Sequence, residues 1–185
     1  MRKSPWILSL ALLVTLGALG CQGTADDKDT GGVTLSIVDF DGLPVVVSAS
    51  EALANAGLVQ VEQMVVENVV LSPGATTSSL MNVEIQSYEV TYTRADTGRR
   101  TPPTLIEYVF GIAPVAGRFT LDNGPVMRLD QFNTAPLRDL IDYGYDRETG
   151  SQVVRLTVGI RFFGKTLSGK AVDSAPAYFT LDVVP

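Results

Sequence analysis

The chain has 185 residues, no histidine, a single cysteine and a formal net charge of −6. The absence of histidine excludes Ser-His-Asp and Cys-His catalysis as well as imidazole metal sites. The excess of acidic residues disfavours nucleic acid as a partner, because a phosphate backbone is bound mainly by cationic side chains.

The first 20 residues have the composition of a secretion signal. Arg2 and Lys3 form a basic start, and the run from Trp6 to Leu19 is almost entirely apolar. This run is shorter than the ~20 apolar residues that a membrane-spanning helix requires. The pattern therefore predicts a signal peptide over residues 1–20.

The segment Gly17-Ala18-Leu19-Gly20-Cys21 resembles the lipobox of bacterial lipoproteins, with Ala18 and Leu19 in the reverse of the usual order. The resemblance implies lipidation at Cys21 and a membrane partner reached through acyl chains, which anchor stably when two or more are present. Gln22 replaces the Asp that retains many lipoproteins at the inner membrane, so we expect a lipid-anchored protein of the bacterial cell envelope at the outer membrane. The alternative is an ordinary signal peptide that leaves Cys21 as a free thiol.

Residues 21–32 follow as a lipidated cysteine and an acidic linker without a large apolar side chain. Such a segment has little apolar surface to offset the entropy of ordering, so we expect a flexible tether. The remaining residues, 33–185, are predicted to form one β-domain.

Short strands and turns dominate the first part of that domain. Strands are predicted over 33–38, 44–48 and 58–71, with a turn at Asp41-Gly42. Between the second and third of these, Ser50 is predicted to cap a short helix that ends at Gly57.

The central strands are marked by alternating apolar residues. In the segment 83–92 the apolar positions change parity after Ser87, which predicts a β-bulge there or a strand that crosses between sheets. A further strand is predicted at Ile106, Tyr108, Phe110 and Ile112, which recur at period two. A short helix from about Pro136 to Gly144 is expected to cross one end of the sandwich.

The last third predicts a hairpin. The first strand places Val154, Leu156, Val158, Ile160 and Phe162 on one face and Arg155, Thr157 and Arg161 on the other. That alternation is typical of a strand with one solvated face. The chain then returns through Ala171 to Val183, where Pro176 is compatible only with an edge or a bulge.

Seven to nine short strands in about 150 residues favour an all-β fold, an antiparallel β-sandwich with one or two short helices in its connections. The size and strand spacing resemble immunoglobulin-like and fibronectin-like domains of cell-surface proteins, and the C-terminal hairpin resembles that of uncharacterised bacterial envelope β-domains. This likeness implies an architecture and no activity.

No cofactor and no metal are expected, although two acidic loops are secondary candidates for calcium. One loop contains Asp39 and Asp41, and the other contains Asp142, Asp146 and Glu148. Calcium needs six to eight oxygen ligands, and the simpler interpretation of Asp41-Gly42 is a hairpin turn.

Two further groups of side chains are considered for binding or catalysis. Tyr143 and Tyr145 are candidate binding residues for sugar stacking or protein contact, although packing of one ring in the core is the simpler interpretation. Glu84, Glu89 and Glu107 lie on predicted strands and are candidates for carboxylate catalysis, although a solvated strand face explains them more simply. Arg99 and Arg100 are placed on an exposed connection.

These observations favour a non-enzymatic, membrane-tethered envelope lipoprotein whose β-sandwich is an interaction or structural module. An envelope protein or a glycan is the expected partner, and the periplasmic and surface faces of the membrane both remain open. The alternative is a small-ligand or carbohydrate-binding lipoprotein, with a calcium ion in an end loop. An interaction module predicts an exposed edge or patch, whereas a ligand-binding protein predicts a concave pocket with convergent polar groups.

Overall fold

The computed structural model describes residues 31–185, so the predicted signal peptide, Cys21 and most of the predicted linker lie outside the described residues. The strands are β1 (Val33–Asp41), β2 (Val46–Ser48), β3 (Val59–Val70), β4 (Val83–Arg94), β5 (Leu105–Ala113), β6 (Arg118–Met127), β7 (Val154–Thr166), β8 (Ala171–Asp173) and β9 (Ala177–Val184). The helices are α2 (Ala49–Ala54), the 3-10 turn η1 (Ser79–Met81), α3 (Leu129–Phe132) and α4 (Leu137–Tyr143).

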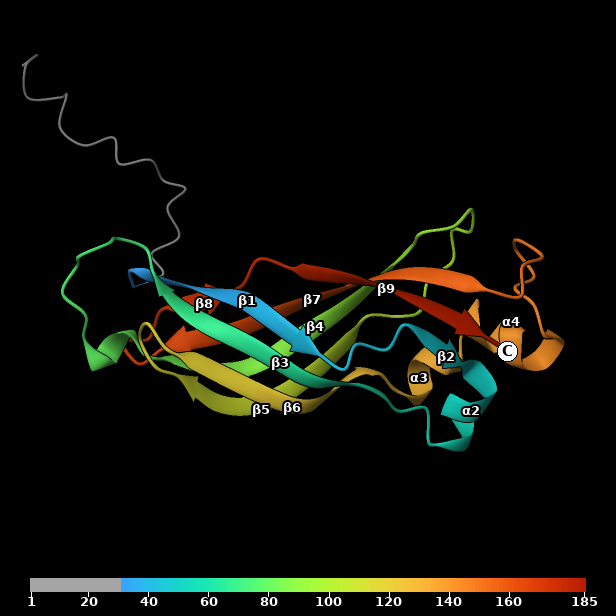
Figure 1. The fold of residues 1–185 in the computed structure, drawn as a ribbon, viewed down its shortest axis with the longest axis horizontal. Coiled ribbons are helices and arrows are strands. Elements are labelled where there is room, and N and C mark those ends of the chain that lie inside the picture. The colour runs from blue at the N-terminus through green and yellow to red at the C-terminus, as the bar shows by residue number, and fades with distance from the viewer. Residues whose placement is uncertain (1–30) are drawn as a thin grey trace, which may run out of the picture.

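The strands form two packed β-sheets (Figure 1). One sheet has three strands in the order β1-β3-β6, and the other has six, in the order β2-β9-β7-β4-β5 with β8 also paired to β7. Neighbouring strands are antiparallel except β2, which runs parallel to β9. The predicted all-β antiparallel sandwich is confirmed.

β7 is a central strand of the larger sheet, and its faces are as predicted. Its even-numbered residues from Val154 to Phe162 are buried, and the Phe162 ring lies 5.2 Å from that of Tyr88 between ring centroids. Arg155, Thr157 and Arg161 lie on the opposite face. The predicted return strand is split around Pro176 into β8 and β9, which both pair with β7.

The predicted β-bulge in β4 is confirmed. The pairing of β4 with both β5 and β7 shifts register between Ile85 and Ser87. Before the shift Val83 and Ile85 are buried, and after it Tyr88, Val90 and Tyr92 are buried. The extra residue keeps apolar side chains in the core on both sides of the bulge.

The helices α2, α3 and α4 gather at one end of the sandwich, opposite the end where β1 begins (Figure 1). α4 ends at Gly144, whose φ of 75° is the left-handed C-cap that glycine favours. α2 begins earlier than predicted, because Ser48 and not Ser50 accepts the capping hydrogen bond from the Glu51 amide. The helix α3 was not predicted.

The predicted hairpin turn at Asp41-Gly42 is wrong. β1 pairs with β3 in the smaller sheet, whereas β2 pairs with β9 in the larger sheet. Gly42 does adopt a positive φ of 61°, and its amide donates to the Asp41 carboxylate at 2.8 Å. The chain therefore turns here to cross between sheets and not to form a two-stranded ribbon.

Candidate interaction surface

β5 carries a stripe of large apolar side chains that point into solvent. Tyr108 is 87% exposed and Phe110 is 80% exposed, and they are flanked by Ile106 at 58% and Ile112 at 48%. We call these four residues the β5 stripe. The strand lies at the edge of the six-stranded sheet. A one-sided sheet normally turns its large apolar side chains inward, whereas the inner face of β5 carries the smaller buried residues Leu105 and Ala113 and its aromatic rings point outward.

The packing of the inner face of β5 explains this orientation. A side chain at Gly111 would place its Cβ 2.0 Å from the Phe119 ring of β6. Earlier on the same inner face, the Glu107 carboxylate accepts a hydrogen bond from Arg128 at 2.9 Å. The inner side of β5 thus holds a glycine and an ion pair between the buried residues Leu105 and Ala113, and the close approach of Phe119 leaves no room for a ring at position 111.

The outer surface of the larger sheet continues from the β5 stripe across β4 and β7. Residues paired across antiparallel strands point to the same face, and the register aligns Tyr108 with Ser87 of β4 and Phe163 of β7. Phe163 borders a hollow of about 730 Å³ between β4, β7 and β8. The Arg161 guanidinium lies 5.2 Å from the centroid of the Phe163 ring and also contacts Asp173 of β8.

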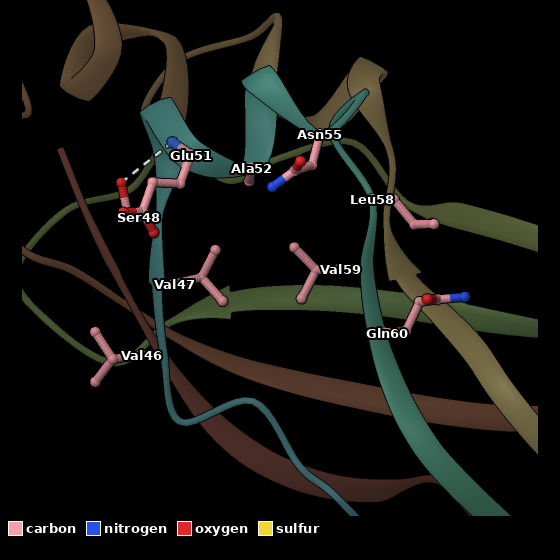
Figure 2. A pocket seen from close by; sticks show the side chains of 9 residues that line it. All are labelled: Val46, Val47, Ser48, Glu51, Ala52, Asn55, Leu58, Val59 and Gln60. Atoms are coloured by element: carbon pink, nitrogen blue, oxygen red, sulfur yellow. Dashed lines mark hydrogen bonds between the residues drawn. The ribbon is translucent and has the colours of Figure 1, made fainter.

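A second hollow, of about 320 Å³, lies between β2, α2 and the start of β3 (Figure 2). Figure 2 shows Val47 and Val59 lying between these segments. The Ser48 hydroxyl at its rim is already engaged, since it donates to the Pro185 carbonyl at 2.9 Å and accepts from the Glu51 amide. The Gln60 side chain is likewise engaged, since it donates to the Asn123 carbonyl at 2.7 Å, and Glu51 and Asn55 are the other polar residues that line this hollow.

The secondary calcium candidates are not brought together. Asp41 lies at the end of β1, and the Asp142 carboxylate accepts from Arg138 at 2.9 Å. Asp146 is fully buried and bonded to protein groups. Among residues 31–185, no three or more acidic or cysteine side chains form a group that could hold a metal ion.

Asp146 is the centre of a buried ionic network that the sequence did not suggest. Its carboxylate accepts from Arg94 at 2.9 Å and Thr149 at 2.8 Å, and the side chains of Arg94 and Asp146 are 3% and 0% exposed. Burial alone raises the pKa of the Asp146 carboxyl, but hydrogen bonds from Arg94, the Glu148 amide and Thr149 together hold it below its ordinary value of 3.8. The network ties the end of β4 to the loop before β7.

Arg100 joins the same network from the connection between β4 and β5. It donates to Asp139 of α4 at 3.1 Å and lies 3.6 Å from Asp146. The expectation of an exposed connection holds only in part, because Arg100 is engaged with these carboxylates and its side chain is 45% exposed.

Tyr143 and Tyr145 both lie on the surface, 52% and 44% exposed. The interpretation that one ring packs in the core is therefore wrong. Their ring centroids are 6.4 Å apart at an interplanar angle of 53°, and the Arg147 guanidinium lies 4.9 Å from the Tyr143 centroid. The arrangement is a small aromatic and cationic patch at the C-terminal end of α4.

The three candidate catalytic carboxylates do not converge. Glu84 and Glu89 lie on the outer face of β4, on either side of the bulge, whereas Glu107 points to the inner side of β5 and pairs with Arg128. Glycosidase chemistry needs two carboxylates about 5–9.5 Å apart that face a common substrate. Glu107 does not share a face with the other two.

None of the helices in residues 31–185 is long and apolar enough to span a membrane. No protein-family model matches the chain, and a search of curated proteins finds no match.

Proposed function

We propose that this chain is a cell-envelope lipoprotein whose β-sandwich is a non-enzymatic interaction module. The observation that carries the proposal is the β5 stripe, where Tyr108 and Phe110 expose most of their rings. At ~150–250 Å² per aromatic side chain, these two rings leave roughly 250–400 Å² of surface in water. Apolar patches of that size on a soluble domain commonly mark a contact with another macromolecule.

The lipid anchor is supported by the sequence before the domain. A basic start, an apolar run and a small residue before Cys21 match the lipoprotein pattern. β1 begins at the end of the sandwich opposite α2, α3 and α4 (Figure 1). A tether from Cys21 would therefore join the domain at that end, and the β5 stripe lies along the side of the domain.

A non-enzymatic role is supported by the residues available for catalysis. The sequence has no histidine, and the Asp146 and Glu107 carboxylates are held by arginines. Because the pKa of the Asp146 carboxyl is held below its ordinary value, this group is poorly suited to take up a proton near neutral pH.

Binding of a small ligand or a carbohydrate is the second candidate, and the observation that favours it is the exposed pair Tyr143 and Tyr145. Aromatic faces of this kind can stack on sugar rings. The tilt of 53° between the rings prevents a single flat platform. Titration with soluble glycans, followed by tyrosine fluorescence of the wild type and of Tyr143→Ala, separates this candidate from the first.

Two measurements test the main proposal. Mass spectrometry of the protein extracted from membranes should find a mature chain that begins with an acylated Cys21; an unmodified thiol would contradict the anchor. A photo-reactive phenylalanine analogue at position 108 should form adducts in intact cells. The same analogue at exposed Thr180, on the same sheet face, is the control. Equal adduct formation at both positions, or none at position 108, would contradict an interaction module that uses β5.

A further inference from the structure

We propose that the occupant of the β5 stripe is a second copy of this chain, bound face to face through the outer surface of the six-stranded sheet. This inference rests on the proposed interaction function and on the lipid anchor. It commits to one geometry, a two-fold axis that runs along the strands between β4 and β7.

The first support is that one sheet face carries both a projection and a hollow. The β5 stripe lies at one edge, and the hollow of about 730 Å³ lies two strands further on, between β4, β7 and β8. A two-fold rotation about the proposed axis exchanges β4 with β7 and places β5 opposite β8. The stripe of each copy then lies over β8, at the rim of the hollow of the other.

The register places the matching positions at the same level along the strands. Ile112 aligns with Glu84, Lys165 and Ala171, and Tyr108 aligns with Ser87 and Phe163. Rotation about an axis parallel to the strands preserves that level. Tyr108 and Ile112 of one copy therefore meet the β8 segment Ala171–Asp173 of the other, at the rim of its hollow.

The second support is charge complementarity under the same rotation. Glu84 and Glu89 lie on the outer face of β4, and their register partners on β7 are Lys165 and Arg161. Exchanging β4 with β7 brings Glu84 and Glu89 of one copy opposite Lys165 and Arg161 of the other, where Arg161 is also paired with Asp173 of its own chain. The outer face also holds Arg155 paired with Asp182 at 2.7 Å, so this face is nearly balanced although the chain carries a net charge of −6. Such a balance removes most of the repulsion between two acidic copies.

The third support is the direction of the tether. The strands run roughly along the long axis of the domain, and β1 begins at one end of it (Figure 1). A two-fold axis along the strands leaves both copies of Val33 at the same end of the dimer. This arrangement lets both flexible linkers reach one membrane without either of them running the length of the domain. An axis perpendicular to the strands would direct the two anchors to opposite ends.

The β5 stripe alone supplies half or less of a standard interface. The Tyr108 and Phe110 rings contribute roughly 250–400 Å² per copy, against the ~800 Å² per partner of a standard interface. The outer surface of β4 and β7 between the stripe and the hollow must therefore take part in the contact. Two-fold symmetry uses each stripe and each hollow once, so the assembly closes at a dimer.

A charge-exchange experiment on the full-length protein in detergent tests this geometry. Glu84→Lys and Lys165→Glu each place like charges across the interface twice, so each variant alone should sediment as a monomer where the wild type is dimeric. A 1:1 mixture of the two variants should recover the dimer, because each contact then joins a lysine of one variant to a glutamate of the other. Glu84 and Lys165 are also neighbours across β4 and β7 of one chain, but mixing two variants does not change contacts within a chain. Recovery of the dimer on mixing would therefore report a contact between chains.

Two further variants complete the test. Tyr108→Ser should weaken the dimer by about tenfold or more, as loss of a central aromatic anchor does. Thr180→Lys, on the same face but beyond the end of β5, should leave it unchanged. A monomeric wild type that still forms adducts from position 108 with a different protein would overturn the second-copy inference and leave the proposed function intact. A monomeric wild type without adducts would overturn both.

Discussion

Arg94→Gln should strongly destabilise the domain, because it removes the main cation from a buried carboxylate. The Asp146 side chain is 0% exposed and accepts from Arg94 at 2.9 Å. Breaking a buried ion pair by removing one partner typically costs ~3–5 kcal/mol, since the remaining charge is buried without compensation. At roughly 2–4 °C per kcal/mol for a domain of this size, the melting temperature should fall by about 6–20 °C.

The matched control is Arg138→Gln, which makes the same substitution in an ion pair of the same length that is exposed to solvent. Arg138 lies 2.9 Å from Asp142, but the two side chains are 44% and 38% exposed. Because exposed pairs contribute little to stability, this variant should unfold at the wild-type urea concentration. Equal midpoints for the two variants would refute the argument that burial of Asp146 sets the cost.

The same pair should also make stability depend on pH in a definite direction. The pKa of the Asp146 carboxyl lies below its ordinary value of 3.8 in the folded protein. A lowered folded pKa stabilises the fold above the unfolded value, and that contribution is lost as pH falls through the folded value. Wild-type stability should therefore decline below about pH 4, and the decline should be shallower in Arg94→Gln. If Arg94 is the counter-ion of Asp146, neither calcium nor a chelator should shift the unfolding midpoint of the wild type or of Arg94→Gln. A large shift on chelation would show instead that the loop holds an ion.

Two further predictions concern the core. Phe162→Ala should cost ~3–5 kcal/mol of unfolding free energy in chemical denaturation, because Phe162 is fully buried against Tyr88. Thr180→Ala on the solvated face should change stability little, and similar losses for the two variants would mean that the faces of the larger sheet are misassigned. Tyr92→Phe should cost ~1–3 kcal/mol, because the Val126 carbonyl loses the hydroxyl donor at 2.5 Å. Burial raises the pKa of Tyr92, so its absorbance should not titrate before alkaline unfolding. Ionisation of Tyr92 in the native protein would contradict that burial.

Local sequence patterns were enough to predict the fold class and the faces of most central strands. β7 alternates between Val154 and Phe162 because one face lies in the core, and the parity change near Ser87 appears directly as a bulge. These features depend on residues adjacent in the chain. Periodicity identifies them without knowledge of the partner strand.

The features that were missed depend on residues far apart in the chain. Alternation identified β5 as a strand, but it could not show which face is buried. That depends on the packing of Gly111 against Phe119 and on the pairing of Glu107 with Arg128. Likewise, Arg94 and Asp146 are 52 positions apart, and no local pattern links them. The acidic loop was therefore considered as a cation site when its counter-ion is an arginine.

The β5 stripe can be tested for binding without disturbing the fold. Tyr108 and Phe110 are largely exposed and lie on the side of β5 away from the core, so replacing both with serine should remove little stabilising packing. It should even reduce the tendency of an apolar edge strand to aggregate. If Tyr108 and Phe110 stabilise the domain no more than serine would and also lower its solubility, a contact outside the monomer explains why they are aromatic. A Tyr108→Ser, Phe110→Ser variant should lose adduct formation and should unfold in urea like the wild-type monomer, measured at a protein concentration too low for the dimer; a large loss of monomer stability would place the stripe in the fold after all.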